Sequence, residues 1–180
     1  MSDRSLADLT GKTTIVTGAN TGVGRVTAET LAKQGAKVFL ASRSKAKTEP
    51  VIDGIRAAGG KAEFLQLDLG SFDSIRKAAS DYLASGEKLD VLVNNAGLAG
   101  QHGKTTDGFE LIIGTNHLGP FLFTLLLLPR LRESTPARIV NVASGSHYDA
   151  KSIPFERFRE KTWTTTGMEE YSISKLCNVL

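Results

Sequence analysis

Five short runs of apolar and β-branched residues recur along the chain, and longer segments with a helical spacing of apolar positions separate them. The runs occupy residues 13–18, 37–42, 62–69, 90–95 and 138–144. None of them alternates cleanly between apolar and polar positions. Near-continuous apolarity is typical of strands in a parallel sheet whose two faces are both covered. The pattern therefore predicts five parallel strands that are buried on both faces.

The segments between these runs predict helices. They lie at residues 24–35, 44–58, 71–86 and 107–132, and a last helix contains residues 171–175. The first helix places Val26, Thr30, Leu31 and Ala32 near one face. The third opens with Ser71 as its N-cap. The fourth is long and apolar, and Pro120 is expected to bend it.

Strands and helices alternate with short connections, as in βαβ units with right-handed crossovers. The sequence therefore predicts an α/β fold, a Rossmann-type doubly wound parallel sheet flanked by helices, in one domain spanning residues 1–180. One connection, at 145–168, is long enough to be functional or mobile. Its aromatic residues predict either the border of an apolar substrate site or a small apolar cluster under a surface loop. They are Tyr148, Phe155, Phe158 and Trp163.

Composition narrows the class of protein without naming a function. The chain has 180 residues, 41% hydrophobic and 23% charged, as in an ordinary soluble globular domain. Its net charge is +3 with no dense basic run, which gives little reason to expect a nucleic-acid partner. The single cysteine, Cys177, cannot form an internal disulfide, which fits a reducing, cytoplasmic location. His102, His117 and His147 have no metal-ligand spacing, so no metal site is predicted.

No segment is predicted to cross a membrane. Residues 1–12 are polar and lack the apolar core of a signal peptide. The longest apolar stretch, residues 118–129, is too short to span a bilayer and is interrupted by Gly119 and Pro120. We interpret it as a buried helix.

A glycine-rich stretch, TGANTGVG at residues 17–24, joins the first predicted strand to the first helix. Gly18, Gly22 and Gly24 allow a tight turn and a close approach of backbone to a ligand. The N-terminus of the helix then offers free N–H groups and a positive dipole to a pyrophosphate. The spacing G-x3-G-x-G differs from the general dinucleotide fingerprint. The alternative is a glycine-rich turn that binds nothing.

The end of the second strand bears on which dinucleotide would bind. The sequence there is LASRSK, which has no acidic residue to accept a ribose hydroxyl but contains Arg43. A guanidinium pairs well with a 2′-phosphate, which favours NADP(H) over NAD(H). Arg43 as a solvated surface residue is the alternative. Asp68, at the end of the third strand, is expected either to accept the adenine amino group or to cap the next helix.

Tyr171 and Lys175 are separated by four residues, and such a pair arises by chance in many chains. On a helix, however, the two residues lie one turn apart on the same face. A free tyrosine has a pKa of about 10, and a nearby cation lowers the pKa by roughly 1–3 units. Ser144 directly follows an apolar strand, at the sheet edge where ligands bind in open α/β folds. These residue types suit proton transfer to a substrate oxygen.

Five motifs stand in a characteristic order: TGxxxGxG at 17–24, NNAG at 94–97, Asn116, NVAS at 141–144 and YxxxK at 171–175. In this order the chain resembles the short-chain dehydrogenase/reductases, and within that family the retinol-dehydrogenase-like branch. The resemblance implies that Tyr171 is the general acid/base and that Ser144 hydrogen-bonds the substrate carbonyl. It implies that Lys175 holds the nicotinamide ribose and lowers the pKa of Tyr171. Asn116 would anchor a water that relays protons through Lys175.

The resemblance, together with the glycine loop, implies a set of cofactor-binding residues. Asn94 would brace the backbone, and Gly97 would allow close approach of the adenosine side. The set is Gly18, Thr21, Gly22, Val23, Gly24, Arg43, Asp68, Leu69, Asn94, Ala96, Gly97, Tyr171 and Lys175.

These roles have alternatives. Tyr171 and Lys175 could be an exposed pair on a terminal helix. Ser144 could cap a turn before Gly145, and Asn116 could distort a helix without a role in proton transfer. Tyr148 is a rival acid/base because it lies near Ser144, but Ser152 rather than a lysine follows it by four residues. We therefore rank Tyr148 below Tyr171.

The predicted function is an NADP(H)-dependent oxidoreductase that interconverts a small apolar alcohol and an aldehyde or ketone. Family members continue past the YxxxK helix, so the resemblance implies that the sheet is incomplete at its C-terminal end and that the chain is truncated. They commonly form homo-oligomers through the long apolar helix and the YxxxK helix. The alternatives are a dinucleotide-binding module without catalysis and a non-functional fragment.

Overall fold

The computed structural model describes residues 7–180, and the first six residues of the polar N-terminal stretch lie outside it. Five strands and the main helices follow the predicted order. In chain order the elements are β1 (Thr13–Thr17), α1 (Gly22–Lys33), β2 (Lys37–Ser42), α2 (Lys45–Ala57), β3 (Lys61–Gln66), α3 (Phe72–Ala84), β4 (Val91–Asn94), α4 (Leu111–Ile113), a π-helical turn η1 (Gly114–Leu118), α5 (Gly119–Glu133), β5 (Arg138–Asn141), the 3-10 turns η2 (Gly145–Asp149) and η3 (Phe155–Arg157), and α6 (Met168–Cys177).

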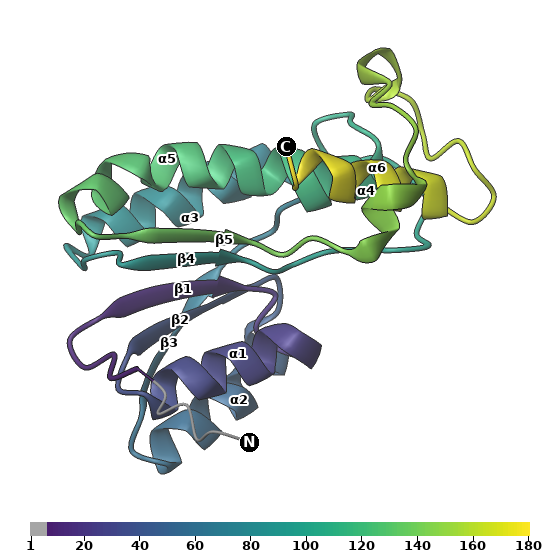
Figure 1. Ribbon diagram of the computed structural model, residues 1–180. Helices are drawn as coiled ribbons and strands as arrows, with labels where there is room; N and C mark the ends of the chain where they lie inside the picture. Colours follow the sequence, from purple (N-terminus) through teal and green to yellow (C-terminus); the bar gives the residue numbers. More distant parts are fainter. Residues whose placement is uncertain (1–6) are drawn as a thin grey trace.

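The five strands form one parallel sheet in the order β3-β2-β1-β4-β5. Helices α1 and α2 cover one face, and α3 and α5 cover the other (Figure 1). The chain builds outward from β1 to β3 and then returns to the other side of β1 to add β4 and β5. The strand order therefore reverses between β1 and β4, where ligands bind in folds of this class. The predicted Rossmann-type fold is confirmed.

Burial differs along the sheet, and the prediction of five strands covered on both faces is wrong for its edges. All five residues of β1 are buried, and β2 is buried apart from its first residue. In β3 exposed and buried residues mix, and all four residues of β5 are exposed. In the described residues each of these outer strands has only one neighbour, because the sheet ends at β3 and at β5.

Helix α1 begins at Gly22, two residues earlier than predicted, and its buried face differs from the expected one. The residues that it buries are Gly24, Ala28 and Ala32, whereas Val26 is 61% exposed. Small side chains on this face let the helix lie close to the sheet. Helix α3 begins as predicted, because the Ser71 hydroxyl accepts a hydrogen bond from the amide of Ser74.

The long apolar helix runs from Leu111 to Glu133 as α4, η1 and α5. Residues 107–110, which were predicted to belong to this helix, are not helical. Gly119 and Pro120 do not interrupt it. A π-helical turn directly precedes them, so the expected local distortion falls at residues 114–118. These 23 residues are long and apolar enough to cross a membrane by length and composition, but half of the most apolar window is buried inside the protein. Phe123, Leu127 and Leu131 pack in the core, as expected for a core helix.

Residues 145–168 form a partly ordered insert between β5 and α6. Phe158 is buried in a small cluster with Ile113, Ile173 and Cys177, and the partly buried Trp163 packs against this cluster. In contrast, Tyr148 is 84% and Phe155 is 71% exposed. The side cluster predicted as one alternative is therefore present, while two of the four aromatic side chains remain outside it.

Candidate active site

The glycine loop forms a tight turn at the carboxyl end of β1. Gly18 has φ +66° and Gly22 has φ +55°, values that favour glycine. A Cβ on Gly24 would meet the carbonyl oxygen of Gly18 and the side-chain amide of Asn95, so this position admits no side chain. Thr21 is the N-cap of α1, but its hydroxyl makes no capping bond, and the first turn of the helix has no acidic residue. The N-terminal amides of α1 are therefore suited to an anion.

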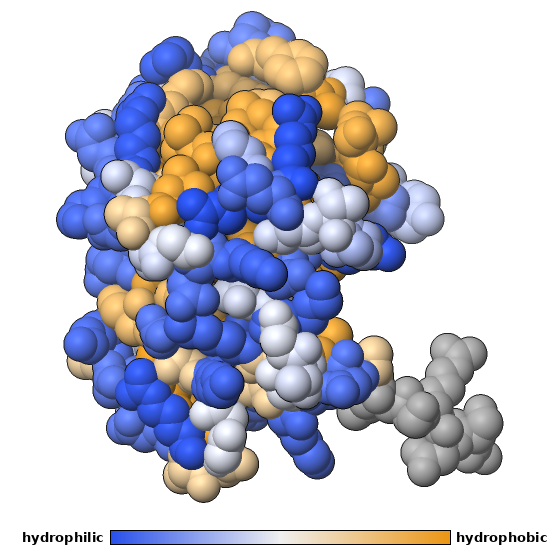
Figure 2. Space-filling view, turned by 90° about the vertical axis from the view of Figure 1, so that its left-hand side faces the viewer, coloured by the Kyte–Doolittle hydropathy of each residue, from blue (hydrophilic) through white to orange (hydrophobic). Residues whose placement is uncertain are grey.

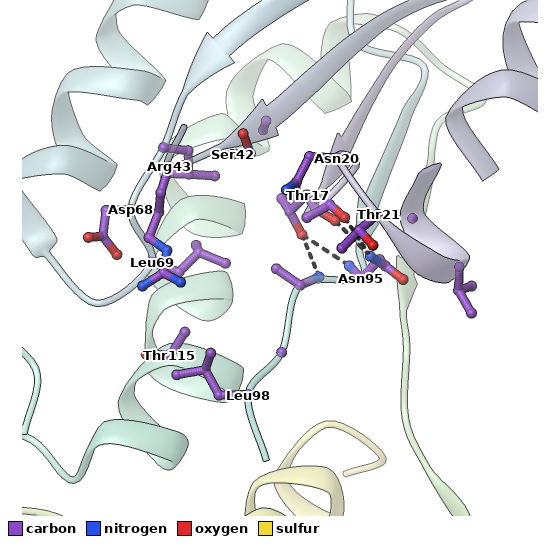
Figure 3. A pocket seen from close by; sticks show the side chains of 17 residues that line it. Thr17, Asn20, Thr21, Ser42, Arg43, Asp68, Leu69, Asn95, Leu98 and Thr115 are labelled. Carbon is purple, nitrogen blue, oxygen red and sulfur yellow. Dashed lines mark hydrogen bonds between the residues drawn. The ribbon is translucent and has the colours of Figure 1, made fainter. Parts of the chain in front are cut away.

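The turn after β4 is bonded to the glycine loop through Thr17. The Thr17 hydroxyl accepts hydrogen bonds from the amides of Asn95 and Ala96, each at 3.0 Å (Figure 3). The Asn95 side chain donates to the Thr17 carbonyl at 2.9 Å. These bonds hold the two loops at the point where the strand order reverses. The NNAG motif predicts the bracing role for Asn94 and does not single out Asn95 or Thr17.

Asn94 braces different elements. Its side-chain amide donates to the Thr124 hydroxyl in α5 at 3.0 Å and to the Asn141 side chain in β5 at 2.9 Å. It therefore ties the sheet to the helical layer beneath the site rather than to the glycine loop.

A cavity of about 350 Å³ lies between these loops and the ends of β2 and β3. This volume is in the range of small-molecule sites. Nine predicted cofactor residues line it: Gly18, Thr21, Val23, Gly24, Arg43, Asp68, Leu69, Ala96 and Gly97. The other four, Gly22, Asn94, Tyr171 and Lys175, do not line it.

Eight further residues that the sequence does not predict line the cavity. They are Thr17, Asn20, Ala41, Ser42, Leu67, Asn95, Leu98 and Thr115. Asn20 and Asn95 lie inside the quoted TGANTGVG and NNAG motifs, so the motifs themselves carried the signal. Thr115 precedes Asn116 but belongs to a helix distant in sequence, and only the fold brings it to the cavity.

Arg43 and Asp68 lie on the same side of the cavity. Arg43 is exposed, and its side chain extends beside Leu69 (Figure 3). Within residues 7–180 no carboxylate pairs with the Arg43 guanidinium. One oxygen of Asp68 accepts the Gly70 amide at 2.9 Å and so shapes the turn before α3. Asp68 thus lines the cavity and also has a structural role close to the predicted alternative, although the N-cap itself is Ser71.

Helix α6 carries Tyr171 and Lys175 on one face. Lys175 is 4% exposed, and its ammonium lies 5.6 Å from the centre of the Tyr171 ring. The ammonium donates to the Val142 carbonyl, just beyond β5, at 2.9 Å. Burial lowers the pKa of Lys175, because a charged ammonium loses hydration there. The two side chains therefore do not point apart, and Lys175 is anchored at the carboxyl edge of the sheet.

Ser144 and Asn116 approach this helix from different elements. The Ser144 hydroxyl accepts the amide of Ser146 at 3.2 Å, so Ser144 caps the turn η2 as the structural alternative proposed. Turn η2 packs against α6, which places Ser144 near the Tyr171 helix. Asn116 is 1% exposed in the π-helical turn and is hydrogen-bonded to Ser174 of α6 at 3.0 Å.

The rival Tyr148 points toward solvent. Its ring packs at a tilt against His147 with ring centres 3.9 Å apart, and His147 is bonded to the Ser144 carbonyl at 2.6 Å. Ser152 stands four residues after Tyr148, whereas Lys175 stands four residues after Tyr171 with its ammonium over the Tyr171 ring. The geometry therefore favours Tyr171 as the candidate acid/base.

A five-stranded parallel sheet in this order, with a glycine loop at its switch point, defines a Rossmann-type nucleotide-binding fold. A model of the family described as short chain dehydrogenase matches residues 12–152. The chain is 46% identical over 179 residues to retinol dehydrogenase 11 of Homo sapiens, a match covering 98% of this chain and 56% of that protein. It is 43% identical to dehydrogenase/reductase SDR family member 13 of Bos taurus, with 98% and 47% covered. This chain belongs to the short-chain dehydrogenase/reductase family.

Solved structures agree with this assignment. An uncharacterized protein from Mycobacterium paratuberculosis superimposes with a TM-score of 0.83 at 40% identity, over 97% of this chain and 61% of that one. A metagenomic short-chain oxidoreductase in complex with NADP gives a TM-score of 0.78 at 29% identity, over 96% and 74%. The chain spans about half the length of the curated relatives that it matches.

Proposed function

We propose that this chain forms the nucleotide-binding and proton-transfer part of an NADP(H)-dependent oxidoreductase that interconverts an alcohol and an aldehyde or ketone. The observation that carries the proposal is the position of Gly97. This residue lines the cavity, and a Cβ on it would lie 3.4 Å from Asn116 Oδ1 and 3.5 Å from Lys175 Nζ. The cavity therefore adjoins the residues suited to proton transfer.

The residues present fit a dinucleotide. The uncapped N-terminus of α1 and the glycine loop suit a pyrophosphate, and the cavity beside Asp68 and Leu69 suits an adenosine. Exposed Arg43 has no carboxylate partner among the described residues and suits a 2′-phosphate. A structural relative at 29% identity was solved with NADP, which agrees with this preference. When bound, the nicotinamide supplies the hydride chemistry.

The chain's own residues would handle the proton and the substrate oxygen. Tyr171 would give its phenolic proton to the oxygen of a carbonyl substrate, or take the proton from an alcohol. Lys175, held by the Val142 carbonyl, keeps an ammonium beside the Tyr171 ring. The Ser144 hydroxyl would donate to the same substrate oxygen. Both N–H groups of the Asn116 side chain are used in protein contacts, to the Leu98 carbonyl and the Ser174 hydroxyl, so a water held by Asn116 would donate to one of its oxygens.

The proposed substrate is a small apolar alcohol or carbonyl compound. The curated relatives named as retinol dehydrogenases support this class. The exposed aromatic side chains of Tyr148 and Phe155 in the insert agree with it.

We further propose a homo-oligomer, because Phe121 and Leu125 of α5 are 57% and 49% exposed. Figure 2 shows hydrophobic side chains gathered in the upper part of one face, where α3 and α5 lie.

The cofactor preference is tested by binding. NADPH and NADH are titrated against the unaltered chain and against Arg43→Gln, with fluorescence as the readout. We expect Arg43→Gln to weaken NADPH binding by about tenfold or more and to change NADH binding little, because only NADPH has the phosphate. Arg132→Gln, an exposed arginine in the last turn of α5, is the matched control. Equal losses for both nucleotides would refute the role of Arg43.

The reaction is tested by turnover. NADPH oxidation with a panel of apolar aldehydes and ketones is compared for the unaltered protein, Tyr171→Phe and Tyr148→Phe. We expect Tyr171→Phe to lose about 100-fold or more in rate and to retain NADPH binding, because only the proton donor is removed. Tyr148→Phe should retain most of the activity. Equal turnover by Tyr171→Phe and the unaltered protein would remove Tyr171 from the mechanism.

The second candidate is a dinucleotide-binding module without turnover. It is favoured by one observation: none of Asn116, Ser144, Tyr171 and Lys175 lines the cavity, so binding and reaction are structurally separable. NADPH binding with no turnover on any substrate in the panel would support this candidate.

A further inference from the structure

Helix α6 presents four polar side chains at positions i, i+3, i+4 and i+7, which lie along one face. They are Tyr171, Ser174, Lys175 and Asn178, the last being the C-cap of the helix. Tyr171 and Lys175 have a place in the proposed reaction. Ser174 and Asn178 have none, yet both are hydrogen-bonded to Asn116 in the π-helical turn η1.

Proline removes the α-helical partner of the Asn116 carbonyl. In an α-helix this oxygen would accept the N–H of the residue four positions later, which here is Pro120, and proline has no N–H. The side-chain amide of Asn178 donates to the Asn116 carbonyl at 3.0 Å. An amide from another helix therefore replaces the donor that proline removed.

The orientation of the Asn178 amide follows from its two partners. A carbonyl only accepts, so the Asn178 nitrogen must face the Asn116 carbonyl. The Asn178 oxygen then faces His117 Nδ1 at 3.0 Å, and His117 must donate from that nitrogen. Because Nδ1 carries a proton in this tautomer and in the imidazolium alike, the contact does not depend on the charge of His117.

The Asn116 side chain carries this contact onward to the cavity. Its oxygen accepts the amide of Leu98 at 2.7 Å, and its nitrogen donates to the Leu98 carbonyl at 2.9 Å and to the Ser174 hydroxyl at 3.0 Å. Leu98 and the preceding Gly97 line the cavity. Residues at the end of α6 thus hydrogen-bond the carbonyl and the side chain of Asn116, and Asn116 in turn hydrogen-bonds Leu98 in the cavity wall.

We propose that Asn178, assisted by Ser174, is a positioning residue that replaces the missing N–H of Pro120, stabilises the π-helical turn, and so holds Asn116 and the Leu98 wall in register with Lys175. The inference rests on the proposed function for its effect on turnover. Its structural part is independent, because the contacts join Asn178 to Leu98 whether or not a nucleotide binds.

The test is a cycle between Asn178→Asp and Pro120→Ala. Asn178→Asp retains the size and the acceptor for His117 but sets a second acceptor against the Asn116 carbonyl. We expect amide exchange at Leu98 to accelerate about tenfold and kcat to fall about tenfold with little change in the substrate KM. Pro120→Ala restores a backbone N–H four residues after Asn116. In that background Asn178→Asp should change Leu98 exchange less than about threefold.

Ser174 supplies a second measurement should Asn178→Asp fold poorly. Ser174→Ala removes the hydroxyl that accepts from Asn116 and should also accelerate Leu98 exchange. Ser172→Ala is the matched control, because within residues 7–180 the Ser172 hydroxyl bonds only to the Met168 carbonyl of its own helix. Leu98 exchange that is unchanged in Asn178→Asp and Ser174→Ala, or an Asn178→Asp effect of equal size in both Pro120 backgrounds, would overturn the inference. Altered exchange without any NADPH binding would instead support the positioning and refute the proposed function.

Discussion

The two halves of the candidate site are built from different material. The nucleotide half, at the ends of β1 and β4, consists largely of backbone: glycines that admit no side chain and amides held by the Thr17 hydroxyl. The reactive half consists of side chains contributed by α6, η1 and η2, with the buried ammonium of Lys175 at its centre. Changes in the nucleotide half should therefore reduce stability and binding together, whereas changes in the reactive half should separate stability from activity.

The largest effect is expected at Gly24. Gly24→Ala should lower the free energy of unfolding by about 3 kcal/mol or more and abolish NADPH binding, because the new Cβ would meet the Gly18 carbonyl of the backbone. Gly22→Ala is the control. Nothing lies within 4 Å of a Cβ on Gly22, so only its left-handed backbone, about 1–2 kcal/mol, opposes the change. Denaturant unfolding measures both, and equal costs would contradict the difference between the two glycines.

Thr17→Val should have the next largest effect. The substitution retains the shape of the side chain but leaves the amide of Ala96 without its acceptor and the amide of Asn95 with only the Val93 carbonyl, which costs about 1–3 kcal/mol. NADPH affinity should fall as well. Thr13→Val, in the same buried strand, tests the same change where the hydroxyl makes no hydrogen bond within residues 7–180. If the two variants unfold at the same denaturant concentration, the Thr17 hydroxyl does not join the loops.

Lys175→Met tests whether a change in the reactive half has opposite effects on stability and on activity. The ammonium is buried, has no carboxylate partner among the described residues, and has a lowered pKa. Replacing it with an apolar side chain of similar length should raise the free energy of unfolding by about 1 kcal/mol. Turnover should be lost. Thermal melting and NADPH oxidation measure the two effects, and a less stable variant would show that the Val142 contact outweighs the burial of charge.

The smallest effect is expected at alkaline pH. Burial raises the pKa of the Cys177 thiol from its ordinary value of 9.0 to about 11. The folded chain therefore keeps this proton while the unfolded chain releases it, and the free energy of unfolding falls between about pH 9 and pH 11. The loss should reach about 1 kcal/mol by pH 10.

The comparison with Cys177→Ala isolates this thiol. Lys175, whose pKa burial lowers, and Tyr82, whose pKa burial raises, titrate in the same range and contribute equally to both proteins. The difference between the two pH profiles of unfolding should therefore follow Cys177 alone. A flat difference curve would show that the thiol is accessible to water in the folded state.

Much of the nucleotide half could be predicted from the sequence, because its features are local. A glycine at Gly18 or Gly24 is required by the turn in which it lies, and the turn connects a strand to the next helix. The elements themselves were predicted from hydrophobic spacing, and their boundaries agree within a few residues. The residues of the reactive half were predicted from motifs, but the hydrogen bonds between them were not.

The amino-acid sequence by itself determined the order of the elements, the glycine loop and the pairing of Tyr171 with Lys175 on one helix, because each depends on residues close together in the chain. The parallel sheet followed from the alternation of strands and helices. Only the tertiary structure decided that β1 is buried and β5 exposed, although both runs are apolar, because burial depends on a strand's neighbours in the sheet. It alone decided that Thr17 holds the turn after β4 and that Asn178 meets Asn116. Those partners lie 62 or more residues apart.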